Sequence, residues 1–134
     1  MPDQLTLTIP APTGLNRSGK PTPLWVNAND RSHWTRRARL ARQWRTLALQ
    51  HARLAKLPTG LEHAHITATI HKTRAGRWDA HNLTPTVKHA IDGLVDYGLL
   101  EDDDNTRLTG PDMRAGEPRA KACIILTITP GMKP

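Results

Sequence analysis

Cysteine, phenylalanine and long apolar runs are scarce or absent in this chain of 134 residues. The single cysteine, Cys123, cannot form an internal disulfide. Phenylalanine is absent, and four tryptophans supply most of the aromatic packing. No apolar run approaches the roughly 20 residues that cross a bilayer, and only a short apolar segment follows Asp3 and Gln4. We therefore expect no signal peptide, no membrane partner and a reducing, cytoplasmic location.

The length and composition are typical of one globular domain. A chain of 134 residues buries roughly two thirds of its unfolded surface, which is enough for one core. Apolar residues make up 37% and charged residues 23%, without low-complexity sequence. We expect a single domain over residues 1–134, in which residues 11–23, rich in proline, glycine, serine and threonine, form a flexible loop.

Charge is divided between two regions of a chain whose formal net charge is +7. Residues 17–56 contain ten lysines or arginines and one acid, whereas residues 79–104 contain seven acids and one lysine. A basic surface gains affinity for phosphates by releasing their counterions, so the first region favours a polyanionic partner. The alternative is a solvated basic helix that has no partner.

Hydrophobic periodicity predicts the order strand, helix, strand, helix, strand, which is typical of a small mixed α/β (α+β) domain with two main helices. The predicted strands cover residues 5–9, 63–71 and 121–129, with a further short strand possible at 24–26. The first helix is expected from a cap at Ser32 to Lys56. Its expected buried face, which includes one tryptophan, consists of Leu40, Trp44, Leu47, His51 and Leu54. Trp34 is also expected in the core.

The second helix has clearer ends. Thr84 is a suitable N-cap, Pro85 suits the first helical position and Gly98 suits a left-handed C-cap. The residues expected to face the core are Val87, Ile91 and Leu94. The histidines of the preceding strand, His63, His65 and His71, are expected on a solvent-facing or interface surface rather than in a zinc site.

Acidic and polar residues flank this second helix. Asp79, His81 and Asn82 precede it, and if residues 78–81 are extended, Asp79 and His81 project from the same side. Residues 101–104 are four consecutive acids that follow it. Because a helix of about 13 residues is some 20 Å long, the acidic turn can meet Asp79 only by folding back or by coming from a neighbouring chain. Adjacent carboxylates repel one another, so a partly buried cluster would need a cation such as Mg²⁺ or Mn²⁺. The alternatives are a solvated acidic turn and an Asp79 that only caps the helix.

The same residues resemble the signature of the RusA family of Holliday-junction resolvases. That signature is an Asp-x-Asp-Asn start, a lysine, an Asp-x-Leu within the following helix, a glycine and an Asp-Asp pair. The matching residues here are Asp79-Ala-His-Asn82, Lys88, Asp92-Gly-Leu94, Gly98 and Asp102-Asp103. Residues 26–34 also resemble the polar segment that family members place before their first helix.

The resemblance implies a homodimeric α/β fold that binds four-way DNA junctions and nicks two strands symmetrically in recombination and repair, in a prokaryotic or virus-infected cell. It implies Asp79, His81 and Asp103 as metal ligands and Lys88 as the catalytic lysine. The expected ion is Mg²⁺, with Mn²⁺ favoured by the imidazole of His81, which stands where the signature has a second aspartate. The reaction would be metal-assisted phosphodiester hydrolysis, in which Lys88 stabilises charge on the phosphate.

Arginine binds phosphate through a planar fork of donors, so the basic helix and the turn after the second strand are expected to form the DNA surface. The expected DNA-binding residues are Asn27, Arg31, Arg36, Arg37, Arg39, Arg42, Arg45, Lys72, Arg74 and Arg77. Two alternatives stay open. One is a protein that binds branched DNA without cutting it, and the other is a nuclease that acts on flaps or forks.

Overall fold

A four-stranded sheet and two α-helices make up most of this computed structural model, which describes residues 4–131. The elements along the chain are β1 (Leu5–Pro10), β2 (Thr13–Leu15), β3 (Pro21–Pro23), α1 (Trp34–Ala55), β4 (His63–His71), the 3-10 helix η1 (Ala80–Leu83), α2 (Thr84–Tyr97), β5 (Leu108–Ala115) and β6 (Cys123–Gly131). The mixed α+β class with two main helices is confirmed.

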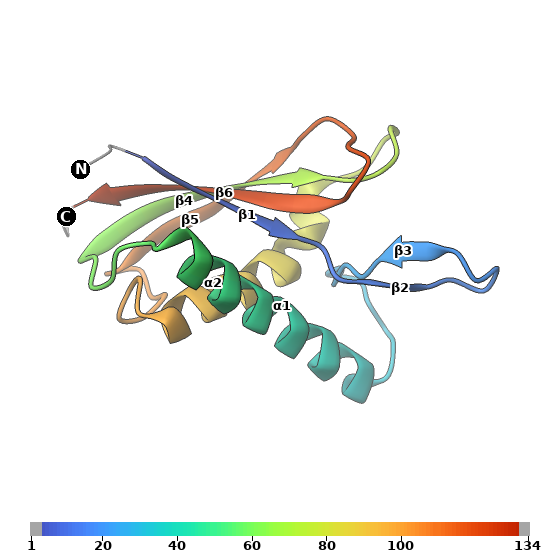
Figure 1. Cartoon of the computed structure of the whole chain (residues 1–134), viewed down its shortest axis with the longest axis horizontal. Helices are drawn as coiled ribbons and strands as arrows, with labels where there is room; N and C mark the ends of the chain where they lie inside the picture. The colour runs from blue at the N-terminus through green and yellow to red at the C-terminus, as the bar shows by residue number, and fades with distance from the viewer. Residues whose placement is uncertain (1–3, 132–134) are drawn as a thin grey trace.

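The sheet has the strand order β1-β6-β4-β5. β6 is antiparallel to both of its neighbours, whereas β5 is parallel to β4. Both helices lie on the same face of this sheet (Figure 1). Within the described residues, no helix is long and apolar enough to cross a membrane.

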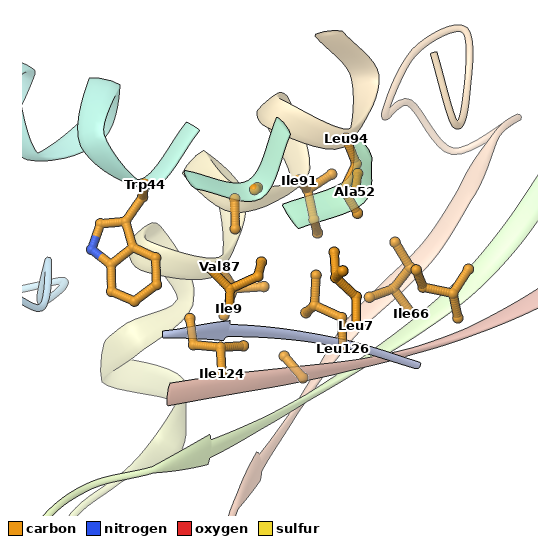
Figure 2. Close-up of a cluster of buried hydrophobic side chains, with 14 of the residues drawn as sticks. Leu7, Ile9, Trp44, Ala52, Ile66, Val87, Ile91, Leu94, Ile124 and Leu126 are labelled. Atoms are coloured by element: carbon orange, nitrogen blue, oxygen red, sulfur yellow. The ribbon is translucent and has the colours of Figure 1, made fainter. Parts of the chain in front are cut away.

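The core lies between this sheet face and the helices. The predicted alternation of β4 and β6 is confirmed, because Ile66 pairs with Ile128 and Ile70 pairs with Ile124 across the strands, all four fully buried. Val87, Ile91 and Leu94 of α2 are fully buried above them, as predicted (Figure 2). Each such side chain contributes about 1.5–3 kcal/mol by leaving water.

The first helix buries only part of the expected stripe, in which Leu40 and Trp44 are buried as predicted. Its buried residues are Leu40, Trp44, Ala48 and Ala52. Leu54 is 77% exposed and Trp34 is 66% exposed, so placing these two in the core was wrong. The buried stripe includes the small residues Ala48 and Ala52 because α1 and α2 approach closely. A Cβ added to Gly93 of α2 would lie only 2.9 Å from the Cβ of Ala48.

The helix caps agree only in part with the sequence. His33, not Ser32, caps α1, because its Nδ1 accepts a hydrogen bond from Thr35 N at 3.2 Å. Thr84 is already the first residue of α2, and its hydroxyl donates to His81 O at 2.7 Å in the preceding 3-10 turn. Gly98 ends α2 with φ at 100°, which confirms the left-handed C-cap.

Residues 11–23, expected to form a flexible loop, contain the antiparallel hairpin β2–β3. The side chain of Asn16 closes its turn by accepting hydrogen bonds from Ser18 N at 3.0 Å and Lys20 N at 2.9 Å. The short strand predicted at residues 24–26 is instead β3, which ends at Pro23. Because the Asn16 side chain bonds the backbone N–H groups of the turn, the segment is ordered, although its composition is typical of a flexible loop.

Strand β5 is absent from the expected order of elements. Only Leu108 and Met113 of its eight residues are buried, and Gly110 and Pro111 interrupt the pattern. An edge strand tolerates such residues, because one side of it makes no ladder hydrogen bonds.

Two of the three histidines of β4 are buried rather than on the surface. His63 Nε2 lies 2.7 Å from Thr109 Oγ1, and His71 Nδ1 lies 2.8 Å from Glu117 O. The side chain of His65 is 42% exposed, and its Nε2 lies 2.6 Å from Asp112 Oδ2. The neighbouring edge strand and the chain that follows it cover the two ends of β4, so the expected histidine surface was wrong for His63 and His71.

Candidate active site

The acidic turn folds back onto the start of α2. Lys88, one turn into that helix, places its Nζ 2.9 Å from Oδ2 of Asp103. The chain reverses after Gly98, where Leu99 and Leu100 are buried and Leu99 O accepts from Leu61 N at 2.9 Å. The turn therefore lies beside α2 of its own chain, but within residues 4–131 no hydrogen bond or ion pair joins it to Asp79.

The four acids of this turn make different contacts. Glu101 pairs with Arg107 at 2.6 Å, and the carboxylate of Asp102 accepts from Asp103 N at 2.7 Å. Asp104 caps the next turn by accepting from Thr106 N at 2.9 Å. Within residues 4–131, Asp103 is the member of the run whose carboxylate is paired to α2.

Asp103 is held in its ionised form. Its hydrogen bond from Lys88 is the main cause that lowers the pKa of its carboxyl below the ordinary value, against the opposing effect of partial burial. At neutral pH the pair is therefore an ammonium and a carboxylate. Lys88 retains a 44% exposed side chain, so its ammonium can also be reached from solvent.

Asp79 caps the 3-10 helix that leads into α2. Its backbone is extended (φ −105°, ψ 116°), and Oδ1 accepts from His81 N at 2.9 Å. An extended stretch over residues 78–81, the condition for Asp79 and His81 to project from the same side, is not met, because η1 begins at Ala80 and buries Ala80 and Leu83. Asp79 and His81 are both exposed at the surface of this turn.

The donors expected to hold a metal ion are of a suitable type but are not gathered. Carboxylates such as those of Asp79 and Asp103 are the oxygen ligands that Mg²⁺ prefers. Within residues 4–131, however, no three histidine, cysteine, aspartate or glutamate side chains lie close enough to share an ion. Asp103 is paired with Lys88 and Asp79 with its own cap, so Asp79, His81 and Asp103 do not form a ready ligand set.

The polar segment before α1 is attached to the start of α2. Val26 N donates to Thr86 Oγ1, which in turn donates to Val26 O, both at 2.8 Å. Ala28 N donates to Asn82 O at 2.7 Å. A cleft of about 370 Å³ results, lined by Trp25, Asn27, Asn29, Asp30, Arg36 and Asn82. The structure thus places Asn27 next to Asn82, whereas Arg31 is exposed nearby.

The basic residues of α1 fall into two groups. Arg36 pairs with Asp30 at 3.4 Å, and Arg45 makes a two-point contact with Asp96 that joins the two helices. Arg37 is exposed, and Arg39 and Arg42 are exposed where they line a hollow of about 560 Å³ beside the end of β1. That hollow does not include Lys88 or Asp103, so its arginines form a surface separate from the acidic turn.

The loop after β4 carries the remaining expected cations. Lys72 places its Nζ 4.4 Å from the ring centre of Trp78, and Arg74 and Arg77 are exposed. Trp34, expected in the core, is instead exposed at the start of α1. The four-residue spacing of Leu40, Trp44 and Ala48 would have excluded Trp34 from the buried stripe.

No protein-family model and no curated protein matches this chain. The resemblance to the RusA family therefore depends on the motif residues alone.

Proposed function

We propose that this protein is a divalent-metal-dependent endonuclease that cuts branched DNA, with four-way junctions as its preferred substrate. The observation that supports it best is the contact between Lys88 and Asp103. It joins the two halves of the RusA-like signature, which lie at opposite ends of α2 in the sequence. The turn that Asp79 caps leads into the same end of α2.

The chemistry follows from the side chains at this end of α2. The exposed ammonium of Lys88 can donate to a phosphate oxygen and stabilise the charge that develops during hydrolysis. Asp103, ionised and oriented by Lys88, and Asp79 would be the carboxylates that hold Mg²⁺ or Mn²⁺, with His81 as an added ligand. A bound ion would supply an activated water and neutralise phosphate charge.

A branched substrate and a homodimer are parts of the same proposal. The exposed arginines of α1 and the cations of the loop after β4 lie in separate regions of one chain, which suits contacts to more than one DNA arm. Two symmetrical nicks need two active sites, which a homodimer supplies. Such an enzyme would work on DNA in the cytoplasm of a prokaryotic or virus-infected cell.

A second candidate is a protein that binds branched DNA without cutting it. The observation in its favour is that no three ligand side chains gather within residues 4–131. His81, where the signature has aspartate, would then mark a site that has lost its activity.

Labelled DNA separates these candidates. Purified protein is incubated with a four-way junction, a flap, a fork and linear duplex, each with Mg²⁺, Mn²⁺ or EDTA. The proposal expects paired nicks in the junction that are lost on Asp79→Asn and on Asp103→Asn, with binding retained. Glu101→Gln is the matched control, because Glu101 lies in the same turn and pairs with Arg107 rather than with α2. Binding without any product under either metal would support the second candidate instead.

A further inference from the structure

The hairpin β2–β3 carries positive charge away from the sheet. It extends beyond the end of β1, well apart from the C-terminal end of α1 (Figure 1). Its turn holds Arg17 and Lys20, and residues 11–23 contain no acid. Because Asn16 closes this turn with its side chain, the backbone that bears Lys20 is fixed.

The loop after β4 brings a second group of cations to the hairpin. Residues 72–77 include Lys72, Arg74 and Arg77 and no acid. The loop and the hairpin together line a cleft of about 400 Å³, made by Asn16, Lys20, Pro21, Thr22, Pro23, Trp25, Lys72, Thr73 and Arg74. We call this the cationic cleft.

No carboxylate lines the cationic cleft. Among the ion pairs of residues 4–131, none involves Lys20, Lys72 or Arg74, in contrast to Arg36 and Arg45 of α1. Trp25 lines the cleft and stacks on the buried Trp44, with ring centres 5.6 Å apart, so the core fixes its ring. Three cations that line one cleft without an acid repel one another, and an anion in the cleft would offset this repulsion.

We propose that the cationic cleft binds the backbone phosphates of one DNA strand. Positive grooves lined with an aromatic side chain are typical of surfaces that follow a nucleic-acid backbone. The cations come from two separate elements, the turn of the hairpin and the loop after β4, an arrangement that suits successive phosphates of a strand better than one compact anion. This inference takes its DNA partner from the proposed function, but it requires neither a metal nor cleavage.

Binding in EDTA tests the cleft without any reaction. The probe is a fluorescein-labelled 12-nucleotide oligothymidine, followed by anisotropy over a range of salt concentrations. The cleft variant is Lys20→Ala/Lys72→Ala/Arg74→Ala. The matched control is Arg53→Ala/Lys56→Asn/Arg114→Ala, which removes the same charge from exposed positions that do not line the cleft. Lys56 is replaced by asparagine because its φ of 53° is left-handed.

Each phosphate contact to a single strand contributes about 0.7 to the slope of log affinity against log salt. The cleft variant is therefore expected to lose roughly 1.4–2 of that slope and at least about tenfold in affinity near 0.1 M salt. The slope of the control is expected to differ from that of the wild-type protein by less than about 0.7, the contribution of one phosphate contact. Circular dichroism and thermal unfolding of all three proteins check that each remains folded.

The outcomes separate this inference from the proposed function. If the cleft variant and the control lose the same slope, or the wild-type protein binds no strand at low salt, the inference is overturned. Inorganic tripolyphosphate that displaces the strand at equal phosphate concentration would overturn it in favour of a small polyphosphate ligand. If junctions are never cut but the cleft variant alone loses strand binding, the proposed function fails and the cleft stands. If the cleft variant cuts junctions with unchanged KM and unchanged strand binding, the proposed function stands and the cleft fails.

Discussion

The contact between Lys88 and Asp103 is strong enough to orient a side chain but too weak to hold the fold. At the observed separation of 2.9 Å, Coulomb's law in the dielectric of water gives an attraction of about 1.4 kcal/mol. The dielectric of water sets the scale because 44% of the Lys88 side chain and 26% of the Asp103 side chain are exposed. Ordering the two side chains offsets part of it, which leaves roughly 0.2–1 kcal/mol, as for other exposed pairs.

We therefore expect Lys88→Met and Asp103→Asn each to lower the free energy of unfolding by about 1 kcal/mol or less at pH 7. Urea unfolding of both single variants and the double variant gives the coupling between them, expected to be about 0.5 kcal/mol. Because Lys88 lowers the pKa of Asp103 in the folded protein, this stabilisation is present above the unfolded value near 3.9. It is lost as the pH falls through the lowered pKa.

The effect on activity should be much larger than the effect on stability. If Asp103 and Lys88 act on the scissile phosphate, each single variant should reduce kcat/KM at least about a hundredfold, equivalent to about 2.7 kcal/mol. A structural ion pair would change activity only through the folded fraction, which a loss of 1 kcal/mol or less barely alters in a stable protein. Unchanged junction cleavage by Asp103→Asn, measured beside the Glu101→Gln control, would refute the catalytic role.

Three further predictions concern the fold. Gly93→Ala should destabilise the protein by about 2 kcal/mol or more in urea unfolding, because the new methyl group would clash with the backbone oxygen of Arg45, although alanine gains about 1 kcal/mol of helix propensity. An unchanged midpoint would show that the helices can move apart freely. Trp44→Ala should cost about 3–5 kcal/mol and Trp34→Ala less than about 0.5 kcal/mol, so equal losses would contradict the burial of the two rings. Burial lowers the pKa of His89, so stability should fall as the pH drops below about 6.5, and this dependence should diminish in His89→Gln when melting at pH 7.5 and 5.5 is compared. If the melting temperature falls equally between pH 7.5 and pH 5.5 in the wild-type protein and in His89→Gln, His89 is not the source of the pH dependence.

The parts of the fold that the sequence predicts well are those that local patterns determine. Ile66 and Ile70 alternate with polar residues, and Gly98 supplies the left-handed conformation that ends α2, so neither feature depends on distant contacts. Strand β5 depends on its neighbour instead. Gly110 and Pro111 oppose strand formation locally, and only pairing with β4 gives this segment its extended form.

The candidate site likewise has features that local sequence determines and features that depend on distant contacts. The length of the second helix shows that the acidic turn must fold back, or come from a neighbouring chain, to reach the start of that helix. That the turn lies beside Lys88 of its own chain depends on the burial of Leu99 and Leu100 after α2, which local sequence does not determine. The cap that Asp79 provides is a local interaction and was among the alternatives from the sequence. The buried face of α1 was predicted correctly at Leu40 and Trp44 but not beyond them, because alanines let α1 approach Gly93 and the periodicity of large residues does not reveal such close contacts.

The acids that gather around α2 have less need of a metal than their number suggests. Asp103 is paired with Lys88, Asp96 with Arg45 and Glu101 with Arg107, so protein cations already offset much of the repulsion. A divalent ion that used Asp103 would have to compete with Lys88 for the carboxylate. If it succeeded, the ammonium of Lys88 would be released beside the ion, where it could donate to a phosphate instead. Lys88→Met should then bind the metal more tightly while cutting DNA more slowly, a combination that a purely structural ion pair does not produce. Calorimetric titration of Mn²⁺ into both proteins measures the first effect, and weaker Mn²⁺ binding by Lys88→Met would contradict competition for Asp103.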